Sequence, residues 1–296
     1  MTPPAVIQGL VIYLFASGLV FFLGCGGVWL SVWLMVRGVA GWKRRLTVVV
    51  CLLGLILISL SAAPLPYWYY GLACTLTIAW LVVEHIKRVE PVRWTSRLRR
   101  ATVMIWLAGA ISEIPFQIAP TLNANGSPPL FVIADSITAG VGEREAVTWP
   151  ELIRRHQQIA IHDYSRMGAG VIAGCAQADR LPDAPGIVLI EIGGNDMLGT
   201  TSLTEFERGL DRLLTRVRDR DRTVLMFELP LPPLCNEYGR IQRRVAARHR
   251  VPLVPKRLLI EVLTWPGNTL DSIHLTQAGH DHMAAVVWKL IRSAFR

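Results

Sequence analysis

Apolar residues dominate the first 120 residues of the chain, in four stretches separated by short polar loops. Each stretch can cover the ~20 residues that a membrane-spanning helix needs, allowing for tilt and boundary error. The fourth is the weakest, because it contains Glu113, Pro115 and Gln117. We therefore predict that residues 1–120 form a transmembrane helical anchor of four helices. The four stretches run roughly from Val6 to Val36, Leu46 to Ala62, Tyr67 to Val83 and Ala101 to Ala119.

The pattern changes after a linker rich in Asn, Gly and Pro at residues 121–129. From residue 130 to 296, short apolar runs alternate with segments in which apolar residues recur at helical spacing. Alternating strands and helices favour an α/β fold with a parallel sheet covered on both faces. The predicted strands are Leu130–Ala134, Gly186–Ile192, Thr223–Leu229 and Val251–Val254, and the predicted helices are Thr148–Gln158, Leu203–Arg218 and Thr276–Phe295.

Charge is distributed unevenly between the two halves. The whole chain of 296 residues has a formal net charge of +9 and is 52% hydrophobic. Residues 1–120 hold 10 Lys and Arg against 3 Asp and Glu, so most of the excess lies in the apolar half. These cations fall between apolar runs, as in the loops of membrane proteins, which argues against a nucleic-acid partner.

The basic loops also predict an orientation. Cations gather after the first apolar stretch and again after the third, whereas Ser61 to Tyr70 carries none. The positive-inside rule then places both basic loops in the cytoplasm and the N-terminus outside. If the fourth stretch spans, the polar half lies outside the cytoplasm, periplasmic if the membrane is a bacterial inner membrane. If the fourth stretch lies flat, the polar half is cytoplasmic.

Three short segments far apart in the sequence carry candidate chemistry. They are Ala134-Asp135-Ser136, Gly193-Gly194-Asn195-Asp196 and Asp271-Ser272-Ile273-His274. The first two follow predicted strands, where catalytic groups of parallel sheets gather. A Ser, a His and a carboxylate are the parts of a serine hydrolase, and an Asn amide can donate to an oxyanion. We expect Ser136 as nucleophile, His274 as base and Asp271 as the residue that orients it.

The same segments resemble those of the SGNH (GDSL-type) hydrolases over about residues 129–295. Gly-Asp-Ser of that family is Ala134-Asp135-Ser136 here, and its Gly-x-Asn-Asp and Asp-x-x-His are both matched. Trp149-Pro150-Glu151-Leu152 is similar to the small thioesterase/lysophospholipase branch. The resemblance implies a flavodoxin-like three-layer sandwich and an oxyanion hole formed by Ser136, Gly170 and Asn195. It implies no metal and no organic cofactor.

Two positions depart from the family pattern. Ala134 replaces Gly, which costs little if the position is an ordinary strand end. The second block has Ser165 in place of Asn, and Gly170 fits the oxyanion position better than Gly168. The resemblance implies an ester hydrolase that acts on a lipid, a thioester or an O-acetylated sugar. An acyltransferase that acts on envelope glycans with the same triad, and an inactive envelope-binding module, stay open as alternatives.

Overall fold

The computed structural model describes residues 3–85, 92–122, 128–142, 147–218 and 221–295. The chain divides into two compact units. The helical unit comprises Leu14–Pro115 with the short segment Pro232–Asn236. The α/β unit comprises Phe116–Leu231 and Glu237–Arg296, and also includes Met1–Tyr13. Most of the expected linker, residues 123–127, lies outside the described residues.

Four long helices make up the helical unit: α2 (Leu19–Val36), α3 (Trp42–Leu60), α4 (Tyr67–His85) and α5 (Val92–Glu113). Helix α2 packs on α3 and on α5, and α4 packs on α5. Large side chains fill the interior, among them Phe21, Trp80 and Trp106. A short 3-10 helix, η1 (Ile114–Gln117), follows α5. The second, third and fourth apolar stretches thus each correspond to a helix.

The first apolar stretch is not the single helix that the sequence predicts. It is divided into α1 (Pro3–Ala16) and α2, with a break at Ser17-Gly18. Gly18 has φ +81°, a left-handed conformation that interrupts an α-helix. Within the described residues, α2 alone is both long and apolar enough to cross a membrane by length and composition. Helix α3 has three cations, Lys43, Arg44 and Arg45, in its first turn.

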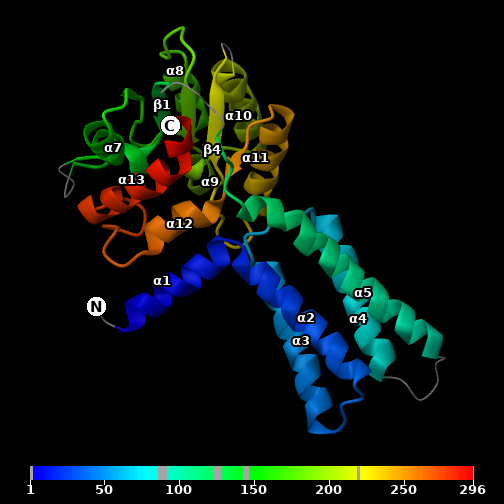
Figure 1. The fold of residues 1–296 in the computed structure, drawn as a ribbon. Helices are drawn as coiled ribbons and strands as arrows, with labels where there is room; N and C mark the ends of the chain where they lie inside the picture. The colour runs from blue at the N-terminus through cyan, green and yellow to red at the C-terminus, as the bar shows by residue number, and fades with distance from the viewer. Residues whose placement is uncertain (1–2, 86–91, 123–127, 143–146, 219–220, 296) are drawn as a thin grey trace. The chain divides into compact units, whose positions relative to one another are not determined.

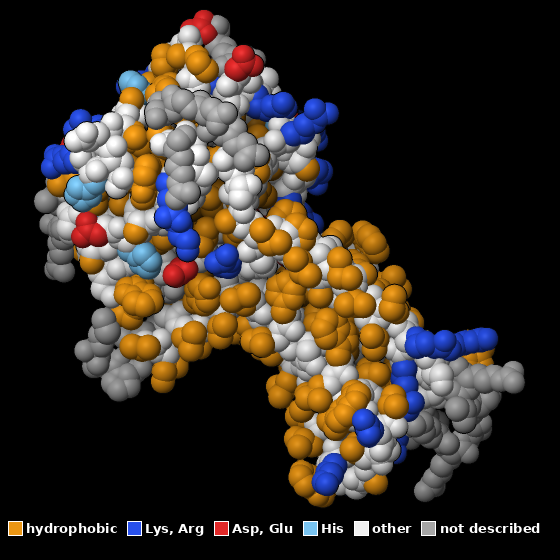
Figure 2. Space-filling model, viewed as in Figure 1, with side chains coloured by type: hydrophobic (Ala, Val, Ile, Leu, Met, Phe, Trp, Pro, Cys, Tyr) orange, Lys and Arg blue, Asp and Glu red, His pale blue; other side chains and the backbone are white. Residues whose placement is uncertain are grey.

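The outer surface of the helical unit is nevertheless strongly apolar. Each of its four long helices exposes large hydrophobic side chains, such as Trp33 on α2, Leu53 on α3, Ile78 on α4 and Met104 on α5. Figure 2 shows hydrophobic side chains covering these helices on the face in view. Such an extended exposed apolar surface is unusual for a protein surrounded by water and marks a contact with lipid or another protein.

A five-stranded parallel sheet forms the centre of the α/β unit, in the order β2-β1-β3-β4-β5. The three central strands are completely or almost completely buried, as expected for a sheet covered on both faces. The sequence missed the short, more exposed edge strand β2. The strands are β1 (Leu130–Ala134), β2 (Ile161–Asp163), β3 (Ile187–Glu191), β4 (Thr223–Phe227) and β5 (Leu253–Val254).

Helices cover both faces of the sheet (Figure 1). Helix α13 packs on α7 and α12, and α8 packs on α10. This is the flavodoxin-like three-layer arrangement expected from the sequence, in which the strand order reverses beside β1. The helices are α6 (Ser136–Ala139), α7 (Trp149–Gln157), α8 (Val171–Ala178), α9 (Gly194–Leu198), α10 (Leu203–Val217), α11 (Asn236–Arg248), α12 (Lys256–Thr264) and α13 (Gln277–Ile291), with a terminal 3-10 turn η2 (Arg292–Phe295).

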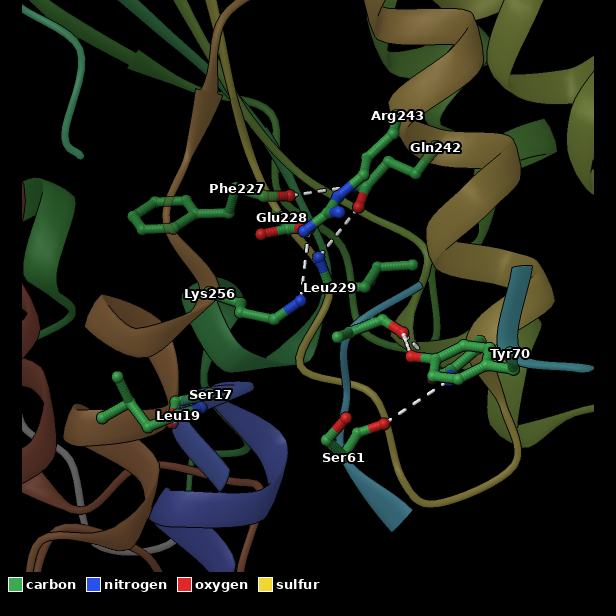
Figure 3. Close-up of polar contacts among 12 residues, drawn as sticks. Ser17, Leu19, Ser61, Tyr70, Phe227, Glu228, Leu229, Gln242, Arg243 and Lys256 are labelled. Carbon is green, nitrogen blue, oxygen red and sulfur yellow. Dashed lines mark hydrogen bonds and ion pairs between the residues drawn. The ribbon is translucent and has the colours of Figure 1, made fainter. Parts of the chain in front are cut away.

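A buried charge cluster lies where β4 ends. Glu228 directly follows the strand and is fully buried. Its Oε1 accepts a hydrogen bond from Arg243 Nε at 2.7 Å and from Lys256 Nζ at 3.3 Å (Figure 3). Lys256, the first residue of α12, is also fully buried, and the Arg243 guanidinium stacks on the Phe116 ring. The carboxylate thereby ties α11 and α12 to the end of β4.

Candidate active site

Ser136 lies at the carboxyl end of β1, at the first position of the one-turn helix α6. Asp135 caps this helix, because its Oδ1 accepts the N–H of Ile137 at 2.9 Å. Ala134 is the last residue of β1 and has no left-handed backbone, so the replacement of Gly requires no strain there. Gln177 holds the peptide groups of Ala134 with two side-chain hydrogen bonds. The tip of the strand that carries Ser136 is therefore fixed from two sides.

The structure brings Ser136, His274 and Asp271 into one hydrogen-bonded relay. His274 Nε2 lies 3.1 Å from Ser136 Oγ, and His274 Nδ1 lies 2.6 Å from Asp271 Oδ2. Ser136 is 5% exposed, whereas the His274 side chain is 28% exposed. The imidazole thus contacts a recessed hydroxyl on one side and a carboxylate on the other. This is the arrangement in which a base can activate a hydroxyl for nucleophilic attack.

The loop that carries Asp271 and His274 is organised around the carboxylate. Asp271 Oδ1 accepts the backbone N–H groups of Ile273 and His274, at 3.1 and 2.9 Å. The backbone bond and then the side-chain bond from His274 hold the pKa of Asp271 down to about 2. Asp271 is therefore ionised at all working pH values. Ser272, which lies between Asp271 and His274 in the sequence, has φ +82°, a strained conformation. The three hydrogen bonds that Asp271 accepts from Ile273 and His274 support it.

Gly170 immediately precedes α8 and lies against Asp196. A Cβ atom on Gly170 would be 2.7 Å from Asp196 Oδ1, so the close approach requires glycine. Asp196 Oδ2 accepts the N–H of Val171 at 2.8 Å, which fixes the first turn of α8. Gly168, the other glycine considered from the sequence, has φ +70°. The Asp of the Gly-Gly-Asn-Asp segment thus supports the loop in which Gly170 lies.

Asn195 lies in α9 and reaches toward the turn that carries Ser136. Its Nδ2 is 3.1 Å from Asp135 Oδ2 and 3.1 Å from the carbonyl oxygen of Ala169. Both amide hydrogens therefore have acceptors within the protein. To donate to an oxyanion as well, one of these amide hydrogens would have to be shared between its present acceptor and the oxyanion. Asn195 is consequently a link between the Ser136 and Gly170 loops.

A buried carboxyl pair, formed by Asp135 next to Ser136 and by Glu191, was missed by sequence reasoning. Glu191, the last residue of β3, is hydrogen-bonded to Asp135 and accepts from Thr138 Oγ1 at 3.3 Å. Burial, and next the charge of Asp135, raise the pKa of Glu191 well above its usual range. Burial raises the pKa of Asp135 to about 6. Glu191 therefore keeps a proton that it can donate to Asp135.

The carboxyl pair continues into a polar chain within the core. Trp149 Nε1 donates to Thr138 Oγ1 at 3.1 Å, and the N–H of Trp149 donates to His280 Nδ1. His280 and Trp149 are both fully buried. The available signal was a single acidic residue, Glu191, within an otherwise apolar central strand. In the part of the chain that the structure describes, no three His, Cys, Asp or Glu residues are grouped to hold a metal.

Comparison with known proteins identifies the class. The model of the GDSL-like lipase/acylhydrolase family matches residues 135–282, half of the chain, and this segment contains all the predicted site residues. Esterase TesA of Pseudomonas aeruginosa is 25% identical over 177 residues, which cover 55% of this chain and 87% of TesA. The thioesterase 1/protease 1/lysophospholipase L1 of Escherichia coli is 28% identical over 152 residues, 47% of this chain and 72% of that protein.

A solved structure shares the fold. The psychrotrophic esterase EstA from a Pseudoalteromonas species has a TM-score of 0.50 and 16% identity, over 57% of this chain and 98% of EstA. The α/β unit is thus an SGNH-type hydrolase, as the sequence resemblance implied. The chain belongs to the GDSL-like lipase/acylhydrolase family and is an esterase of this type, with an additional N-terminal helical unit.

Proposed function

We propose that this chain is a membrane-anchored serine ester hydrolase that forms an acyl-enzyme at Ser136. The observation that carries the proposal is the relay from Ser136 Oγ through His274 to Asp271, with distances of 3.1 and 2.6 Å. The hydrolase class follows from the family, and the relay supports a specific set of roles within it.

The roles follow from the geometry of the imidazole. With the proton on Nδ1 directed at Asp271, Nε2 is free to accept the Ser136 hydroxyl proton as Oγ attacks the acyl carbonyl. The imidazolium then returns that proton to the leaving alcohol or thiol. Water enters, His274 takes a proton from it, and hydrolysis of the acyl-enzyme regenerates the Ser136 hydroxyl. No cofactor takes part in this sequence.

The negative charge on the carbonyl oxygen needs donors close to Ser136. We assign the backbone N–H groups of Ser136 and Gly170 and the side-chain amide of Asn195. The position of α6 directly after β1, and the fixed approach of Gly170 to Asp196, support this assignment. Preorganised donors of this kind typically contribute about 10²–10³ each in rate.

The helical unit supports the membrane proposal. Its outward-facing side chains include large apolar residues on every one of its long helices, and α2 is long and apolar enough to span. One buried charge inside it is paired: Glu84 accepts hydrogen bonds from two nitrogens of Arg99, between α4 and α5. Buried charge in a bilayer is expected to be paired in this way.

We further propose that the α/β unit lies outside the cytoplasm, in the periplasm of a bacterium. One basic cluster, Lys43, Arg44 and Arg45, lies in the first turn of α3. The other, Arg97, Arg99 and Arg100, lies in the N-terminal half of α5. Both clusters are therefore on the N-terminal side of their helix, next to the loops that the positive-inside rule places in the cytoplasm. The second loop, residues 86–91, lies outside the described residues. Phosphatase and fluorescent-protein fusions after Pro129 test this: phosphatase activity supports an external unit, and fluorescence alone contradicts it.

Exposed apolar side chains beside the Gly170 loop, α9 and the His274 loop support an acyl substrate. Met167 precedes the Gly168–Gly170 loop, Ile172 follows it, Leu198 ends α9 and Ile273 precedes His274, and they are 57, 69, 63 and 37% exposed. Apolar groups on the loops around a catalytic serine favour contact with a hydrocarbon chain over contact with a hydrated sugar. Among the substrate classes considered, lipid esters and acyl thioesters therefore fit better than O-acetylated sugars.

Fluorophosphonate labelling tests the proposal most directly. We expect a single adduct on the detergent-purified protein by intact mass, and none on Ser136→Ala. His274→Ala should fold and label much more slowly, because it keeps the hydroxyl but loses the base. An unlabelled wild-type protein that is shown to be folded would contradict the proposed role of Ser136.

A further inference from the structure

Helix α1 is separated from the spanning candidate α2 by a defined turn. Ser17 Oγ donates to the Leu14 carbonyl oxygen at 3.3 Å. The same Oγ accepts the N–H of Leu19 at 3.3 Å (Figure 3). With Gly18 in the left-handed region, these bonds end one helix and begin the next. Fourteen residues of helix extend about 21 Å, less than the ~30 Å of a bilayer core. Helix α1 is therefore too short to span by itself.

One side of α1 packs on α12 of the α/β unit. Gly9 and Tyr13, four residues apart, lie on the same face of the helix. A Cβ on Gly9 would be 2.8 Å from the Thr264 carbonyl oxygen, so the two helices approach closely there. Tyr13 is within electrostatic range of Glu261 and Arg257. Gly9 and Tyr13 therefore both face α12.

The rest of the surface of α1 is mostly apolar and exposed, although Gln8 is also exposed. Val6, Ile7, Leu10, Val11 and Ile12 are 42–62% exposed, and the helix contains no charged residue. Trp265, which follows α12, is 58% exposed and shares with α1 a cavity of about 340 Å³. A short, uncharged helix whose exposed side chains are mostly apolar, beside an exposed Trp, is suited to contact with the boundary of a membrane, where Trp is enriched.

The connection of α1 to α2 indicates that lipid covers the exposed apolar side of α1. Only Ser17 and Gly18 separate α1 from α2, the helix that is long and apolar enough to span. If α2 spans, its first residue lies near a membrane surface, and α1 is covalently held there. We propose that α1 lies along that surface, with its apolar side chains at the boundary of lipid headgroups and acyl chains. This inference rests on the proposed membrane anchor.

The proposed contact between α1 and the membrane surface has a consequence for the substrate. Helix α12 ends at Thr264, seven residues before Asp271, and the intervening loop is braced by bonds from Asn268 N to Trp265 O and from Thr276 N to Asn268 O. A bilayer held against α1 and Trp265 is therefore close to the loop that carries Asp271 and His274. The substrate class that this favours is an amphiphilic ester or thioester whose acyl chain lies in the membrane, taken from the lipid surface.

Lipid-quenching fluorescence on the full chain in nanodiscs tests the position of α1. The five native cysteines are replaced, and bimane is attached at Leu10→Cys, at Leu23→Cys on the exposed surface of α2, or at Gln157→Cys on α7. With brominated phosphatidylcholine, we expect quenching at Leu10 of at least half of that at Leu23, and none at Gln157. Water-soluble iodide should quench only Gln157.

Each other outcome has a distinct meaning. Quenching by lipid at Leu23 but not at Leu10 would overturn the inference and leave the anchor intact. No lipid quenching at either position would overturn the anchor as well. If the Leu10 label is shielded from both lipid and iodide, a second copy or another protein segment covers α1, which also overturns the inference.

An activity comparison tests the consequence for substrate. The double variant Ile7→Glu/Val11→Glu should hydrolyse a lysophospholipid in phosphatidylcholine vesicles about tenfold more slowly, the effect of a ~1.4 kcal/mol loss in surface binding. Its rate on a short soluble ester should be unchanged. Leu203→Glu, at an exposed apolar position of α10, is the matched control and should affect neither rate. Equal loss on both substrates, or no loss on the vesicles, would contradict the proposed substrate route.

Discussion

Asn195 Nδ2 lies 3.1 Å from Asp135 Oδ2, so the residue expected to stabilise the oxyanion also holds the carboxylate that caps α6, the turn that begins with Ser136. The same nitrogen contacts the Ala169 carbonyl oxygen at 3.1 Å. Asn195 thus joins the loop of Ser136 to that of Gly170. Sequence reasoning gave it a role in catalysis only, and the structure adds a role in positioning.

Asn195→Ala should therefore lose both activity and stability. The kcat should fall about 10²–10³ if the amide is an oxyanion donor. The free energy of unfolding should fall by about 1–3 kcal/mol, because Asp135 Oδ2 and the Ala169 carbonyl lose a donor. Urea unfolding followed by pulse proteolysis measures the second effect. Ser136→Ala is the control that loses activity without a comparable loss of stability, and equal stability in both variants would show that the Asn195 bonds carry no weight.

The Asp135–Glu191 pair predicts a pH dependence of stability. Burial raises the pKa of Asp135 from its usual 3.8 to about 6, so the folded state favours the protonated pair. The contribution is fully present below about pH 4 and is lost as the pH rises through 6. The part that comes from Asp135 amounts to about 3 kcal/mol. His274 opposes this shift and Asp196 adds to it, both as smaller effects.

Two variants at Glu191 separate the contribution of its hydrogen bond. Glu191 donates to Asp135 and thereby lowers the pKa of Asp135. Glu191→Leu removes the donor, so the pH at which stability is lost should move upward. Glu191→Gln keeps a donor and should resemble the wild type. Unfolding free energies at pH 4 to 8 measure the difference, and identical profiles for the two variants would rule out the hydrogen bond as the cause.

The fold of the α/β unit was predictable because its central strands are continuous apolar runs. Residues Leu130–Ala134 are a strand with the predicted bounds, and the strand and helix at 186–192 and 203–218 were placed within one residue at each end. Periodicity failed where few residues are buried. Strand β2 has three half-buried or exposed residues, and the one-turn helices α6 and α9 are set by the Asp135 cap and by Gly193 rather than by periodicity.

The candidate site was predictable as a set of residues and not as a network. Ser136, His274 and Asp271 could be chosen by chemical type and order, and the structure places them in contact. The pairing of Asp135 with Glu191 depends on the register of β1 with β3, which a single sequence does not specify. The split of the first apolar run was signalled by Ser17-Gly18, a common turn dipeptide whose effect hydropathy alone does not reveal.

Gly170 offers a steric test of the loop that precedes α8. Gly170→Ala would place a methyl 2.7 Å from Asp196 Oδ1 and displace either the carboxylate or the loop. We expect a stability loss of about 1–3 kcal/mol and at least tenfold lower kcat/KM for ester hydrolysis. Gly194→Ala is the matched control, since its methyl would lie 3.6 Å from Asp135 Oδ2, an ordinary contact. The interpretation fails if Gly170→Ala is as active as Gly194→Ala.

Glu228 predicts an order of stability among variants of the buried cluster. Its Oε1 accepts from both Arg243 and Lys256, two cations around one carboxylate. Glu228→Gln removes the charge that both cations share and should cost about 3–5 kcal/mol, the cost of breaking a buried pair. Lys256→Met leaves the Glu228–Arg243 pair and replaces the lysine by an apolar chain of similar length, so it should cost much less. Urea midpoints of the two variants measure the order, and a larger loss in Lys256→Met would show that the lysine, through its other contacts, is what holds α12 to the end of β4.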